Sequence, residues 1–141
     1  MSDNTPIIEL RRVEVTFNSR TGSLLRPNRV HAVRGVDMCI ERGQTLGIVG
    51  ESGCGKSTTA NVMCGLQMPT KGKVFFNGKE VTKRSAAARR EIGRVVSVVF
   101  QDPATALNPR MHVADQLADP LRVHRIGTES SRAKRVRELI S

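Results

Sequence analysis

Aromatic residues and cysteines are scarce in this sequence. It contains no Tyr or Trp and only 4 Phe, so aromatic residues make up 3% of the chain. Binders of single-stranded nucleic acid stack bases on aromatic side chains, and this chain offers almost no such surface. The cysteines, Cys39, Cys54 and Cys64, are odd in number and form no C-x-x-C pair, which argues against a disulfide framework and a zinc site. We therefore predict reduced cysteines and no nucleic-acid partner.

Long apolar runs are also missing. No stretch approaches the roughly 18 to 20 apolar residues that a membrane-spanning helix needs. Residues 1–6 lack the basic and then apolar order of a secretory signal, so we expect a cytosolic protein. Basic residues are in excess, with 23 Lys and Arg against 13 Asp and Glu, and the resulting charge of +10 attracts phosphate, nucleic acid or anionic lipid without selecting among them. The length of 141 residues fits one compact domain.

Apolar patterns along the chain predict alternating strands and helices, hence an α/β fold. Residues 7–17 and 33–40 alternate as half-buried strands do, and the polar residues 18–29 between them are expected to form a loop. The short apolar runs 45–49 and 95–100 are typical of strands buried on both faces of a parallel sheet. Further expectations are a strand at 73–76, a turn at Asn77-Gly78, helices at 57–66, 85–91 and 113–124 with a kink or break at Pro120, and a last helix capped by Thr128 or Ser130 with Ala133, Val136, Leu139 and Ile140 as its apolar stripe.

One glycine-rich segment carries chemistry. Residues 50–57 read Gly-Glu-Ser-Gly-Cys-Gly-Lys-Ser and match G-x-x-x-x-G-K-[ST] in full. Glycines let successive N–H groups turn inward at the positive end of a helix, where phosphate oxygens are stabilised. Lys56 can then reach the β- and γ-phosphates, and the Ser57 hydroxyl can ligate Mg²⁺. Because a predicted strand precedes the loop and a predicted helix follows it, we favour a site for ATP and Mg²⁺ over a chance glycine-rich turn.

Two segments resemble motifs of ABC-type ATPases. Residues 50–66, GESGCGKSTTANVMCGL, resemble the Walker A loop, and residues 95–103, VVSVVFQDP, resemble the Q-loop. The resemblance implies a P-loop NTPase fold in which residues 1–101 form the β subdomain and P-loop core and residues 102–141 begin the helical subdomain. The sequences FQDP and ALNPRM, which end at Pro103 and Met111, are similar in particular to importer subunits for peptides, dipeptides and nickel.

The resemblance also implies roles for individual residues. Phe17 falls where the family places the aromatic residue that stacks on adenine, and its alternative is a core role at the end of a strand. Gln101 would contact Mg²⁺ or the attacking water and would act in catalysis together with Lys56. The implied contacts to ATP are Phe17, Gly50, Ser52, Gly53, Cys54, Gly55, Lys56, Ser57 and Thr58, and the implied metal ligands are Ser57 and Gln101.

Several motifs of a complete ABC ATPase do not occur in the sequence. It contains no Leu-Ser-Gly-Gly-Gln-like signature, no Walker B strand ending in Asp-Glu and no switch histidine. We therefore expect a truncated domain, and whether the chain is itself an enzyme stays open. Two alternatives remain, namely a catalytically silent nucleotide-binding fragment and another P-loop enzyme such as a small-molecule kinase.

For the complete protein, the resemblance implies an ATP-hydrolysing subunit that drives import of peptides or similar small solutes. Such a subunit works at the cytoplasmic face of the cell membrane as a peripheral protein. Its implied partners are membrane permease subunits, a second ATPase subunit in a homo- or heterodimer and, indirectly, a solute-binding protein.

Overall fold

The computed structural model describes residues 5–19, 28–83, 85–100, 102 and 106–141. The chain divides into two compact units, Met1–Val96 and Ser97–Ser141. None of the helices in the described part of the chain is long and apolar enough to cross a membrane.

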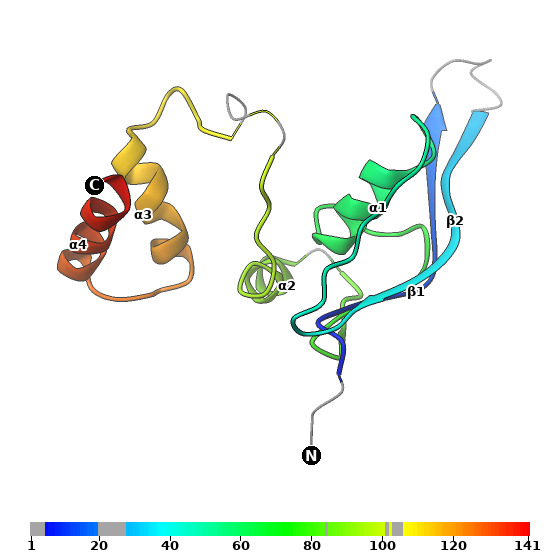
Figure 1. Ribbon diagram of the computed structural model, residues 1–141, viewed down its shortest axis with the longest axis horizontal. Coiled ribbons are helices and arrows are strands. Elements are labelled where there is room, and N and C mark those ends of the chain that lie inside the picture. The colour runs from blue at the N-terminus through cyan, green and yellow to red at the C-terminus, as the bar shows by residue number, and fades with distance from the viewer. Residues whose placement is uncertain (1–4, 20–27, 84, 101, 103–105) are drawn as a thin grey trace. The chain divides into compact units, whose positions relative to one another are not determined.

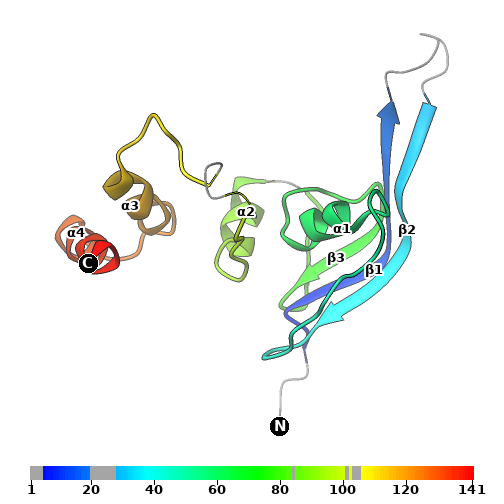
Figure 2. The same cartoon turned by 45° about the horizontal axis from the view of Figure 1, so that its top comes forward.

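An antiparallel sheet of four strands organises the first unit (Figures 1 and 2). Strand β1 (Ile8–Ser19) pairs with β2 (Asn28–Ile40) on one side and with β3 (Lys71–Phe76) on the other, and β4 (Lys79–Glu80) pairs with β3. The three longer strands confirm the predicted ones. The predicted loop at 18–29 is wrong at both ends, because Asn18 pairs with Arg29 inside the ladder and backbone pairing outweighs the polar composition. Residues 20–27 of that loop lie outside the described residues.

The core of the first unit lies where helix α1 (Lys56–Met63) packs against β1 and β2 (Figure 2). The buried strand residues Leu10 and Val13 are three positions apart, which strict alternation would place on opposite faces. The strand pairing shifts register between them, and Arg12 takes a positive φ of 47°. This bulge turns both apolar side chains toward the core. Its backbone is held by the Arg12 N–H, which donates to Asp37 Oδ1 at 2.9 Å.

The turn predicted at Asn77-Gly78 is confirmed as the link between β3 and β4. Phe76 pairs with Lys79, which leaves a loop of the two intervening residues. Both have positive φ, 47° for Asn77 and 72° for Gly78, as a type I′ turn requires. The turn therefore sets the register that carries Lys79 and Glu80 back along β3.

Two predicted strands do not form in the described residues. The runs 45–49 and 95–100 have no strand pairing there, and Val49 and Val99 are each 95% exposed. A strand is stabilised by hydrogen bonds to a neighbouring strand. An apolar run without such a neighbour lacks these backbone hydrogen bonds, and its side chains are not shielded from water. The apolar composition therefore led to a prediction of buried parallel strands that is wrong for this chain.

Helix α2 (Ala86–Ile92) confirms the helix predicted after the hairpin. Ser85 caps it, because the Ser85 side chain accepts a hydrogen bond from the Ala88 N–H at 3.0 Å. Ile92 at its end is buried in the core cluster of the first unit. The C-terminal end of the helix is thereby anchored to the core of the sheet unit.

The second unit contains helices α3 (Val113–Val123) and α4 (Glu129–Ile140) (Figure 1). Thr128 rather than Ser130 caps α4, in a capping box with Ser131 whose Oγ accepts from the Thr128 N–H at 2.8 Å. Of the kink or break predicted at Pro120, the break does not occur, since α3 continues to Val123, and the kink stays a prediction. A proline removes one bond of the helical ladder, and the next turn still closes through the His124 N–H, which donates to the Pro120 carbonyl at 3.0 Å.

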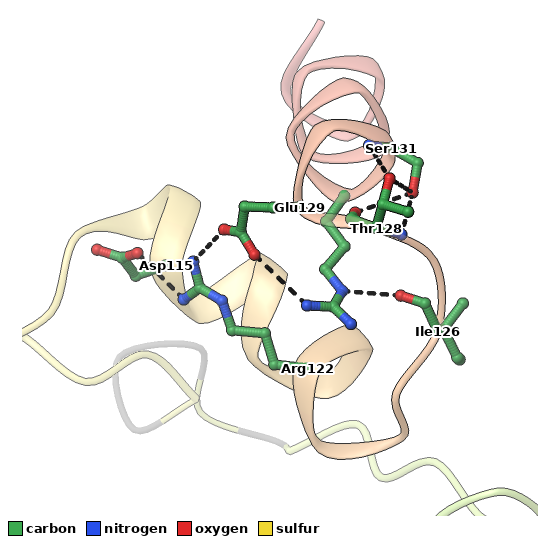
Figure 3. A network of polar contacts seen from close by, with 7 residues as sticks. Asp115, Arg122, Ile126, Thr128, Glu129 and Ser131 are labelled. Carbon is green, nitrogen blue, oxygen red and sulfur yellow. Dashed lines mark hydrogen bonds and ion pairs between the residues drawn. The ribbon is translucent and has the colours of Figure 1, made fainter.

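A network of charged side chains joins α3 to α4 (Figure 3). Arg122 lies 3.4 Å from Asp115 and 3.0 Å from Glu129, and Arg132 lies 3.4 Å from the same Glu129. The hydrogen bond from Arg122 and its positive charge lower the pKa of the Glu129 carboxyl. Because that pKa is lowered in the folded chain, the stabilisation by this pair is present at neutral pH and is lost as pH falls through the lowered value.

The predicted apolar stripe of α4 is buried only in part. Val136 is 5% exposed, whereas Leu139 and Ile140 are more than half exposed. One neighbouring helix covers one narrow strip of a helix surface, so the ends of the stripe stay in contact with water. Of the four residues of the predicted stripe, Val136 is therefore the buried one.

Candidate functional site

The glycine-rich loop leads directly into the first turn of α1. Gly55 is the N-cap of α1 and has a left-handed φ of 94°. A Cβ atom at Gly55 would overlap the carbonyl oxygen of Ala32 on β2, so the loop approaches the sheet as closely as a residue without a side chain allows. This contact with Ala32 is a feature of the site that the sequence motif alone did not indicate.

The start of α1 offers backbone donors to an anion. The first hydrogen bond of the helix runs from the Thr59 N–H to the Gly55 carbonyl at 2.8 Å. The N–H groups of Lys56, Ser57 and Thr58 precede that bond and have no helical acceptor. No acidic residue lies in the first turn, and Gly55 has no side chain to cap it. The helix dipole adds positive potential here, so this turn suits a phosphate group.

The Lys56 side chain reaches back to the start of the glycine-rich loop. Its Nζ donates to the Gly50 carbonyl at 2.7 Å and to the Glu51 carbonyl at 2.5 Å, and the sulfur of Cys54 is 3.7 Å away. An ammonium group has three donors, and the third is directed at the Cys54 sulfur, which is a weak acceptor. A phosphate oxygen beside the loop is a stronger acceptor, so it would replace the sulfur and would also meet the positive charge.

A small hollow of about 140 Å³ lies against these groups. Its lining comprises Ala32, Gly53, Gly55, Lys56, Ser57 and Thr58. The hollow thus joins inward-facing glycines, helix-end N–H groups, an ammonium group and the exposed Ser57 hydroxyl, and this donor set fits a magnesium-bound phosphate chain.

A second hollow of about 280 Å³ lies between β2 and the same loop. It includes His31, Arg34, Cys54 and Thr59 and shares Ala32 and Gly53 with the smaller hollow. The His31 ring is positioned by a 3.2 Å hydrogen bond between its Nδ1 and the hydroxyl of Thr16 on β1. His31 and Arg34 were not among the predicted site residues, because they reach the loop only through the packing of α1 and the loop against β2.

Several other predicted site residues are not found in the lining of the smaller hollow. Phe17 lies on β1 opposite Val30 and is 45% exposed, so it is not a buried core residue, and adenine stacking stays a prediction. Gly50 and Ser52 belong to the loop but do not line the smaller hollow. Gln101 lies outside the described residues.

Comparison with protein families and characterised proteins gives concordant matches. The family described as ABC transporter matches residues 33–141. The chain is 39% identical over 137 residues to the oligopeptide transport ATP-binding protein AppF of Bacillus subtilis (strain 168). This match covers 96% of the chain and 42% of AppF. The chain is also 37% identical over 139 residues to the glutathione import ATP-binding protein GsiA of Salmonella paratyphi A, which covers 98% of this chain and 22% of GsiA. The chain therefore spans less than half the length of these relatives.

Solved structures are similar as well. One is the dimeric ATP-binding cassette MJ0796 in a post-hydrolysis state bound to ADP and Pi, with a TM-score of 0.71 and 25% identity over 93% of this chain and 54% of that one. Another is cbiO1 from Clostridium perfringens, part of the ABC transporter complex cbiONQ, with a TM-score of 0.65 and 26% identity over 95% of this chain and 49% of that one.

Proposed function

The chain belongs to the ABC transporter family, and from that premise we propose that it binds Mg-ATP as part of the ATPase subunit of a peptide importer. One observation carries the proposal. Gly55 is the N-cap of α1 and Lys56 is its first residue, so backbone donors and an ammonium group lie around one hollow. The family match argues against the alternative of a small-molecule kinase.

Each group in the loop has its own part in binding the nucleotide. The N–H groups at the start of α1 donate to phosphate oxygens, and Lys56 neutralises charge on the β- and γ-phosphates. Ser57 is the described residue that would hold Mg²⁺, with Gln101 as the second proposed ligand. When bound, the metal would offset the negative charge of the phosphates. These contacts stabilise the bound substrate, which is separate from lowering the barrier to its hydrolysis.

Replacing Lys56 with Ala is expected to weaken Mg-ATP binding by about 1.5 to 3 kcal/mol, because one charge-assisted hydrogen bond to phosphate is lost. Titration calorimetry would measure this as a dissociation constant roughly 10 to 150 times higher. Lys71→Ala is the matched control, since Lys71 is an exposed β3 residue paired with Glu14. Equal dissociation constants for Lys56→Ala and the unmodified chain would remove the loop as the phosphate site.

Phe17→Ala is expected to weaken ATP binding by about 1 to 3 kcal/mol, by analogy with bases stacked on aromatic side chains. Phe17 is exposed enough to offer its ring to adenine. Binding of inorganic triphosphate should not change, because triphosphate has no base. Phe17→Leu keeps the apolar character and removes the flat ring, so it should behave like Phe17→Ala. If both substitutions leave ATP affinity as it was, the ring does not contact the base.

The assembly of the whole protein belongs to the same proposal. AppF and GsiA are named as ATP-binding proteins of oligopeptide transport and glutathione import, and MJ0796 is described as dimeric. These names support a role in transport and a second ATPase subunit. We further propose a membrane permease and, indirectly, a solute-binding protein as partners, with the chain at the cytoplasmic face of the membrane. We assign residues 1–101 to the β subdomain and nucleotide core. Residues 102–141, which contain α3 and α4, are assigned to the helical part that faces the permease.

A further inference from the structure

A groove lies between the β3–β4 hairpin and α2, within the first unit. Its volume is about 400 Å³, and its lining runs from Phe76 at the end of β3 to Val95 after α2. A volume of this size falls in the range of roughly 300 to 1,000 Å³ that is typical of small-molecule sites.

The floor of the groove is apolar and fixed in place. Phe76 and Ile92 are both buried in the core cluster, and Val81 packs against that cluster. Ala88 faces the groove from α2, and its small side chain leaves the space open. The Asn77-Gly78 turn and the Ser85 cap hold the two walls, because one sets the hairpin register and the other starts α2. An apolar body of ligand size can therefore be buried without rearranging the backbone.

The rim of the groove is positive. Each of its two carboxylates has a basic partner, since Glu80 lies 3.1 Å from Lys73 and Glu91 lies 3.8 Å from Arg94. The two lysines of the lining, Lys79 and Lys83, have no ion pair among the described residues. An anionic group at the rim therefore meets two ammonium groups without an ion pair, while both carboxylates have a basic partner of their own.

We infer that this groove binds a small amphiphilic anion, with its apolar body on Phe76 and Ile92 and its acidic group at Lys79 and Lys83. The groove shares no lining residue with the hollow at the phosphate loop, so the site is separate from the proposed ATP site. The inference does not depend on the proposed function, and failure of one leaves the other standing. Its ligand class follows from an apolar floor beneath an unpaired positive rim.

Anilinonaphthalene sulfonate is a suitable probe, and N-phenyl-naphthylamine has the same aromatic body without the sulfonate. For the 141-residue chain, Lys79→Gln combined with Lys83→Gln should raise the dissociation constant of the sulfonate about tenfold, because two ammonium groups are removed. Binding of the neutral probe should change less than about twofold. Ala88→Trp should abolish binding of both probes in the groove, because the new ring fills it.

Arg89→Gln combined with Arg90→Gln is the matched control. It removes two positive charges, as the lysine pair does, but these arginines are on α2 and do not line the groove. This variant should bind both probes as the unmodified chain does, and saturating Mg-ATP should displace neither. Backbone amide chemical shifts should respond to the sulfonate at residues 76–95. Three results would overturn the inference: displacement by ATP, equal weakening in the arginine control, or sulfonate binding that neither the lysine pair nor Ala88→Trp changes.

Discussion

Gly55→Ala is expected to destabilise the chain by about 3 kcal/mol and to lower its affinity for Mg-ATP on the order of 100-fold. Gly55 has a φ of 94°, a conformation that costs a residue with a side chain about 1 to 2 kcal/mol. In addition, the new Cβ would overlap the Ala32 carbonyl oxygen, which belongs to the backbone of β2 and cannot rotate away. The loop must then move from the sheet, and the donors at the start of α1 move with it.

Gly53→Ala provides the control for this effect. Gly53 also has a positive φ, 81°, but a Cβ there would meet no atom within 4 Å. Only the conformational cost remains, so we expect a loss of about 1 kcal/mol in unfolding free energy and a small change in affinity. Thermal unfolding and calorimetric titration of both variants would measure the difference. Equal effects of the two substitutions would mean that the close approach to Ala32 is unimportant.

The 141-residue chain is expected to bind ATP without turning it over. The described loop supplies contacts to the bound phosphates, and ground-state binding alone does not lower a barrier. The sequence contains no Asp-Glu pair to polarise an attacking water and no signature segment to close on the γ-phosphate. A positioned general base typically contributes 10²- to 10⁴-fold in rate. Because the chain lacks one, we expect it to release phosphate from ATP no faster than the Lys56→Ala variant does.

A chimera would test whether the motifs that this sequence lacks are sufficient to supply the activity. The part of AppF beyond its match to Ser141 can be fused to the chain, because the match covers 42% of AppF. Phosphate release should then rise at least about 100-fold, and Lys56→Ala in the chimera should abolish the gain. Robust hydrolysis by residues 1–141 alone, lost in Lys56→Ala, would show that the chain has a complete catalytic site. Binding without hydrolysis in both proteins would favour the catalytically silent alternative.

Local patterns predicted most elements of the first unit. The alternation in β1 and the Asn77-Gly78 pair are read over a few residues, and the structure confirms both. The failures are of another kind. Residues 45–49 and 95–100 have the composition of buried strands, but burial and pairing require neighbouring strands that the described residues do not provide. Composition shows which surface a segment should bury, and only the fold shows what covers it.

The sequence alone was enough to predict the glycine-rich loop and the helix that it leads into, because glycine conformational freedom, a lysine and a helix N-terminus act over a few consecutive residues. The tertiary structure decided which residues from elsewhere reach that loop. Ala32 contacts Gly55, and His31 lines the neighbouring hollow, because α1 and the loop before it pack against β2. The groove beside α2 likewise depends on how the hairpin and the helix pack, since its lysines are unremarkable in sequence. Contacts between distant segments depend on register and packing, and these are properties of the whole fold.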